Sequence, residues 1–500
     1  MNRDKRSSLH SKYNPQIEAE RYIEKLSLNG DLRYFILIEP GLGYIIAPLK
    51  KKIPGAKTIA LYVEKPINQL TIESPMKSTP EAPDSQWYPE TGISLQDFLE
   101  VSIPDDEASK VKILEWRPAL AVYGKAYLTL VEQASIFIKR IYSNRRTVMA
   151  FGARWFKNFF KNLDFLKNVL FFQNSFPVSL PLLVTGAGPA LEESIPLLKT
   201  CPRSGFFILA SSSSSLALEA EGIFPDMVIT SDGSQWAKFH LYDHYRNVKL
   251  KIDNNDTNWE SFCLAAALTA ALPSQCETTP VLAISDGSFW QALILKELAI
   301  PFIALPQRGT VTATALDLAF NLTKENIYIT GMDLVNRDIR SHSRPYSFDR
   351  FIQEKASRHD PQYSQSYKRA LSLKTGGSYG VYASWFQKQL SVYPRPIYSL
   401  GNNNPLFGVC QAGNFHASNV NGNRDKNTHQ FFKTVRVKSI NPSQLAFAVL
   451  EKALKDPVNK TVQEELISLL LPDQEGQAKG LFEKISSLLG FIHEGNNERR

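Results

Sequence analysis

The chain is poor in the residues that build metal clusters and disulfide frameworks. Its 500 residues include only four cysteines, which are far apart and form no C-x-x-C pair, and eight histidines. Closely spaced cysteine pairs are the usual sign of a structural zinc site, and disulfide-stapled domains carry many more cysteines. We therefore expect free thiols in a reducing compartment, with no bound metal.

Long hydrophobic runs are also missing. The best candidate for a membrane-spanning segment, 262–272, is rich in alanine and far too short to span a bilayer. The first residues, MNRDKRSSLHSK, are polar and lack the apolar core of a signal peptide. Together these features predict a cytoplasmic protein with no membrane partner.

Positive charge is in excess, but it is scattered. Lys and Arg number 57 against 49 Asp and Glu, which gives a formal net charge of +8. No long basic run is interleaved with aromatic residues, so a nucleic-acid partner is not favoured. The excess suits an anionic small molecule such as a sugar nucleotide. At this length two or three domains are expected.

The most informative motif follows an apolar run at 182–185 and contains Gly186, Gly188 and Pro189. It predicts a strand, a tight turn and a helix start. Glycine lacks the Cβ atom where a ligand must approach, proline suits the first helical position, and free N–H groups there suit a phosphate. The motif is neither a Walker loop nor a complete dinucleotide fingerprint, so a plain strand-to-helix turn is the alternative.

Strands alternate with helices from 181 to 334, which predicts an α/β fold. The alternation indicates a Rossmann-like central domain with a mostly parallel sheet and helices on both faces. Because ligands bind at the carboxyl ends of such strands, we expect one site formed by Gly186, Ser211, Asp232, Asp286 and Asp333. The predicted strands are 182–185, 205–210, 226–231, 281–285, 301–305 and 326–330.

Several side chains near these strand ends are candidates for nucleotide binding. Ser211 and Ser212 open a run of five serines, whose hydroxyls could bind a base or ribose or cap the next helix. Asp232 could contact a ribose or cap the following segment. Since Gly233 follows it, no Asp-x-Asp metal motif is present.

A second group of candidates surrounds another helix start. Thr310 and Thr312 offer hydroxyls beside the free N–H groups of that helix, an arrangement that suits a phosphate or a carboxylate. Arg308 precedes them and could pair with such an anion through two parallel hydrogen bonds, or it could be a surface charge.

In this order and with these spacings, four segments resemble the motility-associated-factor (Maf) glycosyltransferase family: 182–191, 222–233, 309–320 and 326–334. That family shares its core with certain bacterial sialyltransferases, which show a similar Gly-x-Gly-Pro-Ser-Leu turn. The core also resembles 6-hydroxymethylpterin diphosphokinases. The resemblance covers roughly residues 180–420.

The resemblance implies a glycosyltransferase that uses a CMP-activated nonulosonic acid of the pseudaminic or legionaminic type. The acceptor would be Ser or Thr of flagellin, and the reaction would invert the anomeric carbon without a metal or other cofactor. Two alternatives stay open: a diphosphokinase-like enzyme that uses ATP and magnesium, and a non-catalytic flagellin-binding assembly factor. The latter is considered because Ala190 replaces the serine of the family turn and the segment 402–404 lacks the expected paired glycines.

The same resemblance suggests catalytic residues. Asp333 and His342 flank a loop that typically ends in Thr-His-Ala in the family, and a histidine of near-neutral pKa is a suitable base for an acceptor hydroxyl. His359 is a second candidate, because sialyltransferases place their histidine after a longer lid. Arg344 could neutralise the departing nucleotide, and Tyr346 could donate a hydrogen bond to it.

A smaller α/β module is predicted at the N-terminus. Strand 33–39 leads into the glycine turn 40–44, and Glu64 ends a second strand about twenty residues later, where a ribose-binding acid is expected. The third glycine is missing, so the module is either structural or a working cofactor site. We expect an N-terminal module with connecting helices at 1–170, a central domain at 171–420 with a helical lid at 335–400, and a C-terminal helical domain at 421–500. Residues 66–110 are expected to lack regular structure.

Overall fold

The computed structural model describes residues 8–28, 31–66, 81–172, 175–253, 263–334, 339–375, 378–400, 408–410, 431–438, 441–472 and 480–494. It divides into two compact units, one formed by residues 1–150 with 471–475 and the other by residues 151–470 with 476–500. The boundary falls inside the helix α5 (Lys125–Phe165), before the predicted boundary at 170. The C-terminal helices group with the central sheet, so the three predicted domains are two units.

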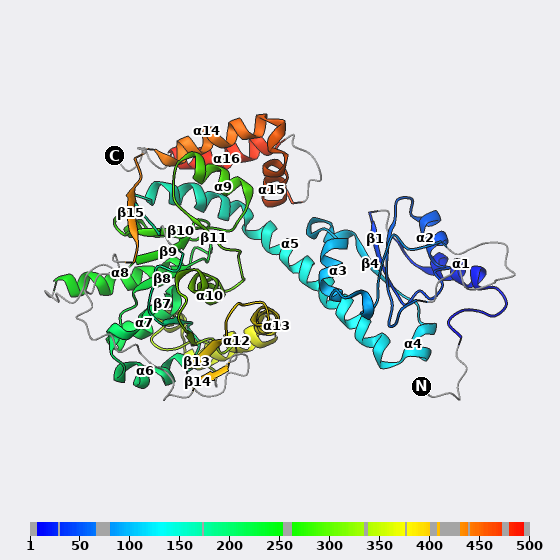
Figure 1. Ribbon diagram of the computed structural model, residues 1–500, viewed down its shortest axis with the longest axis horizontal. Helices are drawn as coiled ribbons and strands as arrows, with labels where there is room; N and C mark the ends of the chain where they lie inside the picture. Colours follow the sequence, from blue (N-terminus) through cyan, green and yellow to red (C-terminus); the bar gives the residue numbers. More distant parts are fainter. Residues whose placement is uncertain are drawn as a thin grey trace. The chain divides into compact units, whose positions relative to one another are not determined.

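The first unit is a parallel sheet flanked by helices. Its strands, in the order β3-β2-β1-β4, are β1 (Tyr34–Ile38), β2 (Lys57–Leu61), β3 (Ser85–Trp87) and β4 (Val111–Glu115). Figure 1 shows α1 (Pro15–Lys25) and α2 (Ile46–Lys52) on one side of this sheet, and α3 (Leu95–Ser102) on the other. The helix α4 (Pro118–Tyr123) precedes α5.

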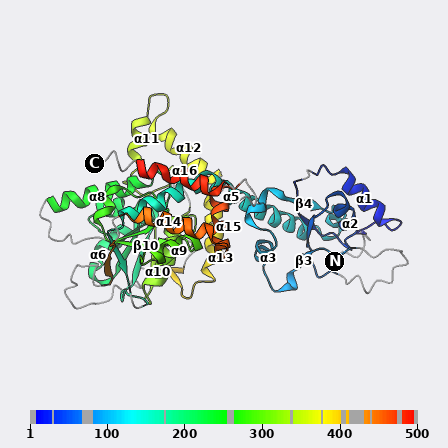
Figure 2. The same cartoon turned by 90° about the horizontal axis from the view of Figure 1, so that it is seen from above.

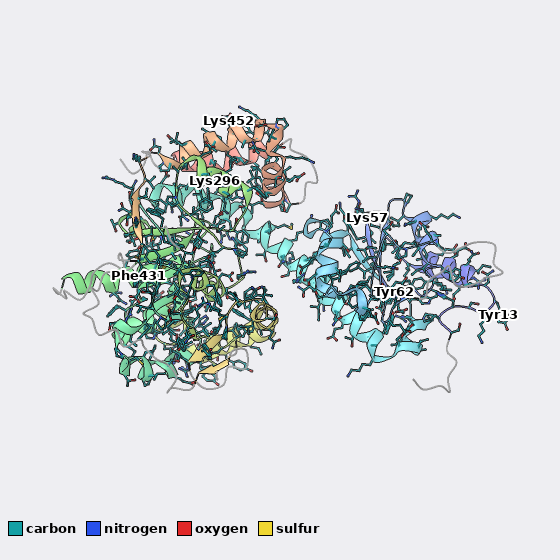
Figure 3. The ribbon with its side chains drawn as sticks, viewed as in Figure 1. Tyr13, Lys57, Tyr62, Lys296, Phe431 and Lys452 are labelled. Carbon is teal, nitrogen blue, oxygen red and sulfur yellow. The ribbon has the colours of Figure 1, made fainter. Side chains whose placement is uncertain are left out.

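The module predicted at the N-terminus is therefore present. Every residue of β1 is buried, as expected for a strand that is covered on both faces. Lys57, the first residue of β2, and Tyr62, which follows its last residue, are labelled in Figure 3. The expectation that 66–110 lacks regular structure is wrong for β3 and α3, since the short strand β3 adds to β2 and the helix α3 buries Leu95 and Leu99.

The second unit contains an eleven-stranded sheet in the order β14-β13-β12-β6-β7-β8-β9-β10-β5-β15, with β11 paired to β10. All pairings are parallel except that of β15 with β5. The strands are β5 (Asn168–Phe171), β6 (Leu182–Thr185), β7 (Phe207–Ser211), β8 (Met227–Thr230), β9 (Cys263–Ala267), β10 (Val281–Ser285), β11 (Ile303–Ala304), β12 (Ile327–Thr330), β13 (Ile397–Leu400), β14 (Gly408–Cys410) and β15 (Lys433–Arg436).

Helices occupy the connections between these strands, which confirms the α/β, Rossmann-like prediction. The helices are α6 (Ala190–Thr200), α7 (Ser212–Ala220), α8 (Lys238–Asp253), α9 (Phe289–Glu297), α10 (Val311–Leu322), α11 (Asp349–Lys355), α12 (Gln362–Thr375), α13 (Ser378–Leu390), α14 (Pro442–Lys455), α15 (Lys460–Leu470) and α16 (Leu481–Glu494). Short 3₁₀ turns lie at Pro89–Thr91, Asp105–Lys110, Arg203–Gly205, Ser274–Thr278 and Pro457–Asn459.

Side chains of α6 and α7 form a buried cluster with Leu183 of β6 and Ile208 of β7. The helix α10 packs across β6, β7 and β8. Three helices, α11, α12 and α13, lie within the predicted lid segment, but that segment also ends in β13, which joins the sheet. No helix among the described residues is long and apolar enough to cross a bilayer.

The helices α14, α15 and α16 lie within the segment 421–500, which was predicted to be helical, and α14 and α15 pack against α9 (Figure 2). The Glu465 carboxylate of α15 accepts the N–H groups of Phe289 and Trp290, each at 3.0 Å, and so caps α9. The rings of Phe156 and Phe159 in α5 lie 5.5 and 4.7 Å from that of Trp290. Phe156 and Phe159 therefore pack inside the second unit, whereas Tyr127 and Phe137, nearer the start of α5, belong to the core of the first.

One carboxyl group of the first unit is unusually buried. Glu39 directly follows β1 with a φ of 46° and is only 3% exposed. Its Oε2 accepts the Val63 N–H at 2.7 Å. Burial raises the pKa of Glu39 from 4.5 to about 7, the Val63 N–H opposes this rise, and the nearby Glu64 charge adds to it.

This raised pKa predicts a pH-dependent stability. Between pH 4.5 and about 7 the unfolded chain ionises Glu39 while the folded chain keeps it protonated, so the free energy of unfolding falls as pH rises, by up to about 1.4 kcal/mol per pH unit. Glu39→Gln should remove this fall. Urea unfolding of both proteins at pH 5 and pH 8 tests it, and equal pH dependence in the two would contradict the buried, protonated carboxyl.

Candidate functional site

The order of the central sheet indicates where a ligand site should lie. From β6 the chain builds β7, β8 and β9 on one side, whereas β12 and β13 lie on the other. In open α/β sheets, ligands bind outside the carboxyl ends of the strands where the order reverses. Both strands at this point end in glycine turns, 186–188 after β6 and 331–333 after β12.

The two glycine turns pack directly against each other through their backbones. The Gly186 N–H donates to Thr330 O at 2.8 Å, and the Gly188 N–H donates to Gly331 O at 2.7 Å. A Cβ atom on Gly186 would overlap Gly331 O, and one on Gly188 would lie 2.7 Å from Asp333 Oδ2. The structure therefore gives both glycines a packing role, whereas the sequence had suggested ligand approach.

Asp333 caps the helix that begins at this turn. Its Oδ2 accepts the Ala190 N–H of α6 at 2.7 Å, while Pro189 has no N–H to offer. Burial raises the pKa of Asp333, and the Ala190 N–H opposes that rise. The carboxylate thus lies where the sequence placed a phosphate, and a phosphate at this helix start would have to displace it.

A loop from the predicted lid docks on the same turn. Glu192 in the first turn of α6 accepts hydrogen bonds from Arg340 Nη1 at 2.8 and 3.0 Å, and one from the Arg344 N–H at 2.8 Å. The Ser343 N–H donates to Ala187 O at 2.7 Å. These contacts hold the loop around His342 over the carboxyl ends of β6 and β12.

His342 lies in this docked loop. Its Nδ1 is 2.8 Å from Ser341 Oγ, and its ring stacks on that of Tyr346 with centroids 4.1 Å apart and planes inclined by 13°. The Tyr346 ring also contacts His240 of α8, at 5.2 Å. The sequence did not indicate His240, because nothing near it in the chain links it to the loop.

A small pocket, open to solvent, brings three predicted residues together: His342, Arg344 and Tyr346. The residues that line it are Ile339, Arg340, Ser341, His342, Arg344, Tyr346, Asp349, Ile352 and Ser366. His359 does not line it, since it lies exposed in the segment between α11 and α12. The structure thus places only one of the two candidate bases beside the glycine turns.

Buried hydroxyls lie behind the first glycine turn. Ser211 Oγ donates to Ser214 Oγ at 3.0 Å, and Ser214 Oγ lies 2.8 Å from Thr185 Oγ1 at the end of β6. Ser212 is also buried. The helix α7 receives no side-chain cap from Ser211, so these serines connect the ends of β6 and β7 to each other.

The residues around α10 are held by other parts of the second unit. Thr310 Oγ1 accepts the Ala313 N–H at 3.1 Å and caps the helix. Arg308 Nε donates to Asp317 Oδ2 at 2.6 Å, and its guanidinium lies 5.1 Å from the centre of the Trp385 ring. Thr312 is buried beside the Gly186 turn.

Asp232 and Asp286 shape turns at their strand ends. Asp232 is exposed, and its Oδ1 accepts the Ser234 N–H at 2.7 Å. Asp286 accepts the Ser288 N–H at 2.9 Å. No group of three or more His, Cys, Asp or Glu side chains that could hold a metal occurs among the residues the structure describes.

Two asparagines of α5 position the loops at this edge of the sheet. Asn158 Nδ2 donates to Gly233 O at 3.2 Å and to Thr269 O at 3.0 Å. Asn162 Nδ2 donates to the carbonyls of Leu268 and Ala270. Their helical pattern alone gave no sign of this role. The segment 402–404 lies outside the described residues.

Comparison with known proteins supports the core similarity predicted from the motifs. Residues 154–338 match the family described as 6-hydroxymethylpterin diphosphokinase MptE-like. An uncharacterized protein of Treponema pallidum (strain Nichols) is 27% identical over 290 residues, which are 57% of this chain and 60% of that protein. The structure of MAf glycosyltransferase from Magnetospirillum magneticum AMB-1 aligns with 97% of this chain and 75% of its own, at 13% identity and a TM-score of 0.47.

The packing of the two glycine turns predicts that one added methyl group lowers the stability of the fold. Gly188→Ala should lower the free energy of unfolding by about 1–3 kcal/mol, because its Cβ would meet Asp333 Oδ2 and Gly331 O. Gly490→Ala in α16 is the matched control, since nothing lies within 4 Å of its Cβ position. Denaturant unfolding of both variants makes the comparison. Wild-type stability for Gly188→Ala would contradict the packing role.

Proposed function

We propose that the chain is a cytoplasmic glycosyltransferase that transfers a nonulosonic acid from a CMP donor to Ser or Thr of flagellin. The observation that carries the proposal is the docking of His342, Arg344 and Tyr346 over the point where the strand order reverses. The ordered motifs that resemble the Maf family supply the substrate class. The reaction inverts the anomeric carbon and uses no metal.

In this proposal His342 is the general base. When its Nδ1–H donates to Ser341 Oγ, the lone pair is on Nε2, which takes the proton of the acceptor hydroxyl. The hydroxyl oxygen then forms a bond to the anomeric carbon as the bond from that carbon to the phosphate oxygen breaks. CMP leaves with the electron pair of that bond.

The neighbours of His342 suit the charges that develop. The imidazolium formed by proton uptake lies against the face of Tyr346, where the negative face of the aromatic ring stabilises a cation. Arg344 lines the same pocket and neutralises the carboxylate of the sugar or the departing phosphate. Arg340 is already paired with Glu192, so its task is to hold the loop.

A second function is favoured by the family match at 154–338, namely a diphosphokinase-like transfer from ATP. Such a reaction needs magnesium to neutralise the transferred phosphates. Asp232 is the exposed carboxylate at a strand end that could take part. This reading predicts nucleotide binding that depends on magnesium.

The two candidate bases give a direct test of the mechanism. His342→Ala should lower kcat for transfer about 10²- to 10⁴-fold while leaving CMP affinity unchanged, because a general base acts on the chemical step. His359→Ala should leave both quantities unchanged, since His359 lies outside the pocket. Transfer rates measured with a CMP-activated nonulosonic acid and purified flagellin decide the matter. Loss of activity in His359→Ala alone would overturn the assignment.

Nucleotide selectivity separates the two functions. A thermal-shift titration with CMP, UMP and ATP, with and without Mg²⁺, should show stabilisation by CMP that does not require the metal. Stabilisation by ATP only in the presence of Mg²⁺ would favour the diphosphokinase-like reaction instead. No response to any of the three would favour the non-catalytic assembly factor.

A further inference from the structure

The loop that carries His342 is held on both sides of that residue. On one side, the Glu192 carboxylate of α6 accepts hydrogen bonds from Arg340 and from the Arg344 N–H. On the other side, aromatic residues that follow Arg344 in the chain pack against the helix α8. The contacts with α8 therefore bear on where the His342 ring lies.

His240 is the residue of α8 at the centre of these contacts, and it is only 6% exposed. Its ring lies 5.2 Å from that of Tyr346 and 4.6 Å from that of Phe348, the latter with planes inclined by 29°. Tyr346 and Phe348 also contact each other, at 5.3 Å, so the three rings form one cluster. His240 does not line the pocket beside His342, which means that it supports the loop from behind.

The Tyr346 ring connects His240 to the proposed base. It is buried, and it stacks on the His342 ring at 4.1 Å. Asp349 fixes the backbone of Tyr346, since its Oδ2 accepts the Tyr346 N–H at 3.3 Å and its own N–H donates to Tyr346 O at 2.9 Å. Because these bonds involve the backbone alone, the direction of the Tyr346 ring depends on the rings packed against it.

The helix α8 is attached to the core of the second unit one turn away from His240. The Glu219 carboxylate of α7 is hydrogen-bonded through Oε1 to His244 Nδ1, and its Oε2 accepts Asn247 Nδ2 at 2.7 Å. Both His244 and Glu219 are buried, and α7 packs along α8. Since residues four apart lie on the same face of a helix, this attachment also fixes the position of His240.

The outer part of the same cluster joins α8 to α11. The Phe239 ring lies 5.1 Å from that of Phe351, and Asp243 Oδ1 lies 3.6 Å from Arg350 Nη1. Trp236 contacts Phe239 and Phe351 but is 58% exposed. The cluster thus extends from His240, which is buried against Tyr346, to a tryptophan at the surface that serves as a control position.

We propose that His240 is a positioning residue for His342, because its flat ring holds Tyr346 in the orientation that stacks on the base. The inference rests on the transfer reaction proposed above. Without the His240 ring, Tyr346 can tip into the vacated space, and His342 loses the surface that aligns it. A displacement of roughly 1 Å in a reacting group can cost about 10²-fold in rate. His240 acts through Tyr346 and touches no substrate.

NMR of the full chain, labelled with ¹³C at Cε1 of its eight histidines, tests the positioning directly. The ring current of Tyr346 shifts the Cε1–H resonance of His342, which the spectrum of His342→Ala identifies. His240→Leu fills a similar volume without a flat ring, so it should move this resonance toward that of a free histidine. His240→Phe and Trp236→Ala should leave it in place. An unchanged His244 resonance shows that α8 is intact in each variant.

The transfer assay gives the second measurement. His240→Leu should lower kcat about 10²-fold and leave the KM for the donor unchanged, because it displaces the base and removes no residue of the pocket. His240→Phe should restore most of the rate, and Trp236→Ala should match the wild type.

An unmoved His342 resonance in His240→Leu would overturn the proposal, as would an equal displacement in His240→Phe. If the wild-type chain transfers no sugar, the proposed reaction is wrong. The NMR comparison needs no turnover, so it would still decide whether His240 positions His342.

Discussion

The backbone contact between the two glycine turns is the constraint on which the central site depends. Gly186 and Gly331 approach each other more closely than any Cβ atom would allow, and this contact fixes the ends of β6 and β12 side by side. Asp333 then reaches the N-terminus of α6 and caps it. The turn that the sequence suggested for phosphate binding is thereby hydrogen-bonded to protein groups, which is why the proposed reaction relies on the docked loop.

Glu192 links this rigid turn to the loop around His342. Its carboxylate binds both Arg340 and the backbone of Arg344, and these contacts place His342 and Tyr346 beside the sheet. The buried Tyr346 ring stacks on that of His342. In the proposed reaction, proton transfer and charge neutralisation come from one short segment, and the strand ends hold that segment in position.

The sequence predicted the parts of the fold that follow from local pattern. Strands β6, β8, β10 and β12 lie close to the predicted ranges, and helices are present in the C-terminal segment that was predicted to be helical. The strand β9 was missed because its sequence CLAAA is rich in alanine, which has low strand propensity, and is buried throughout, so that no alternation marks it. For the candidate site, the sequence could predict where it lies but not which contacts each residue makes. The partners that decide each role, such as Asp333 with Ala190, are far apart in the chain.

Hydrogen–deuterium exchange of the full chain, with and without CMP, tests the central claim most directly. The account predicts protection by CMP of the backbone at 184–191, 331–334 and 339–347, since these segments meet where the strand order of the second unit reverses. CMP binding that protects only other segments, or no binding of CMP at all, would contradict the placement of a nucleotide-sugar site there.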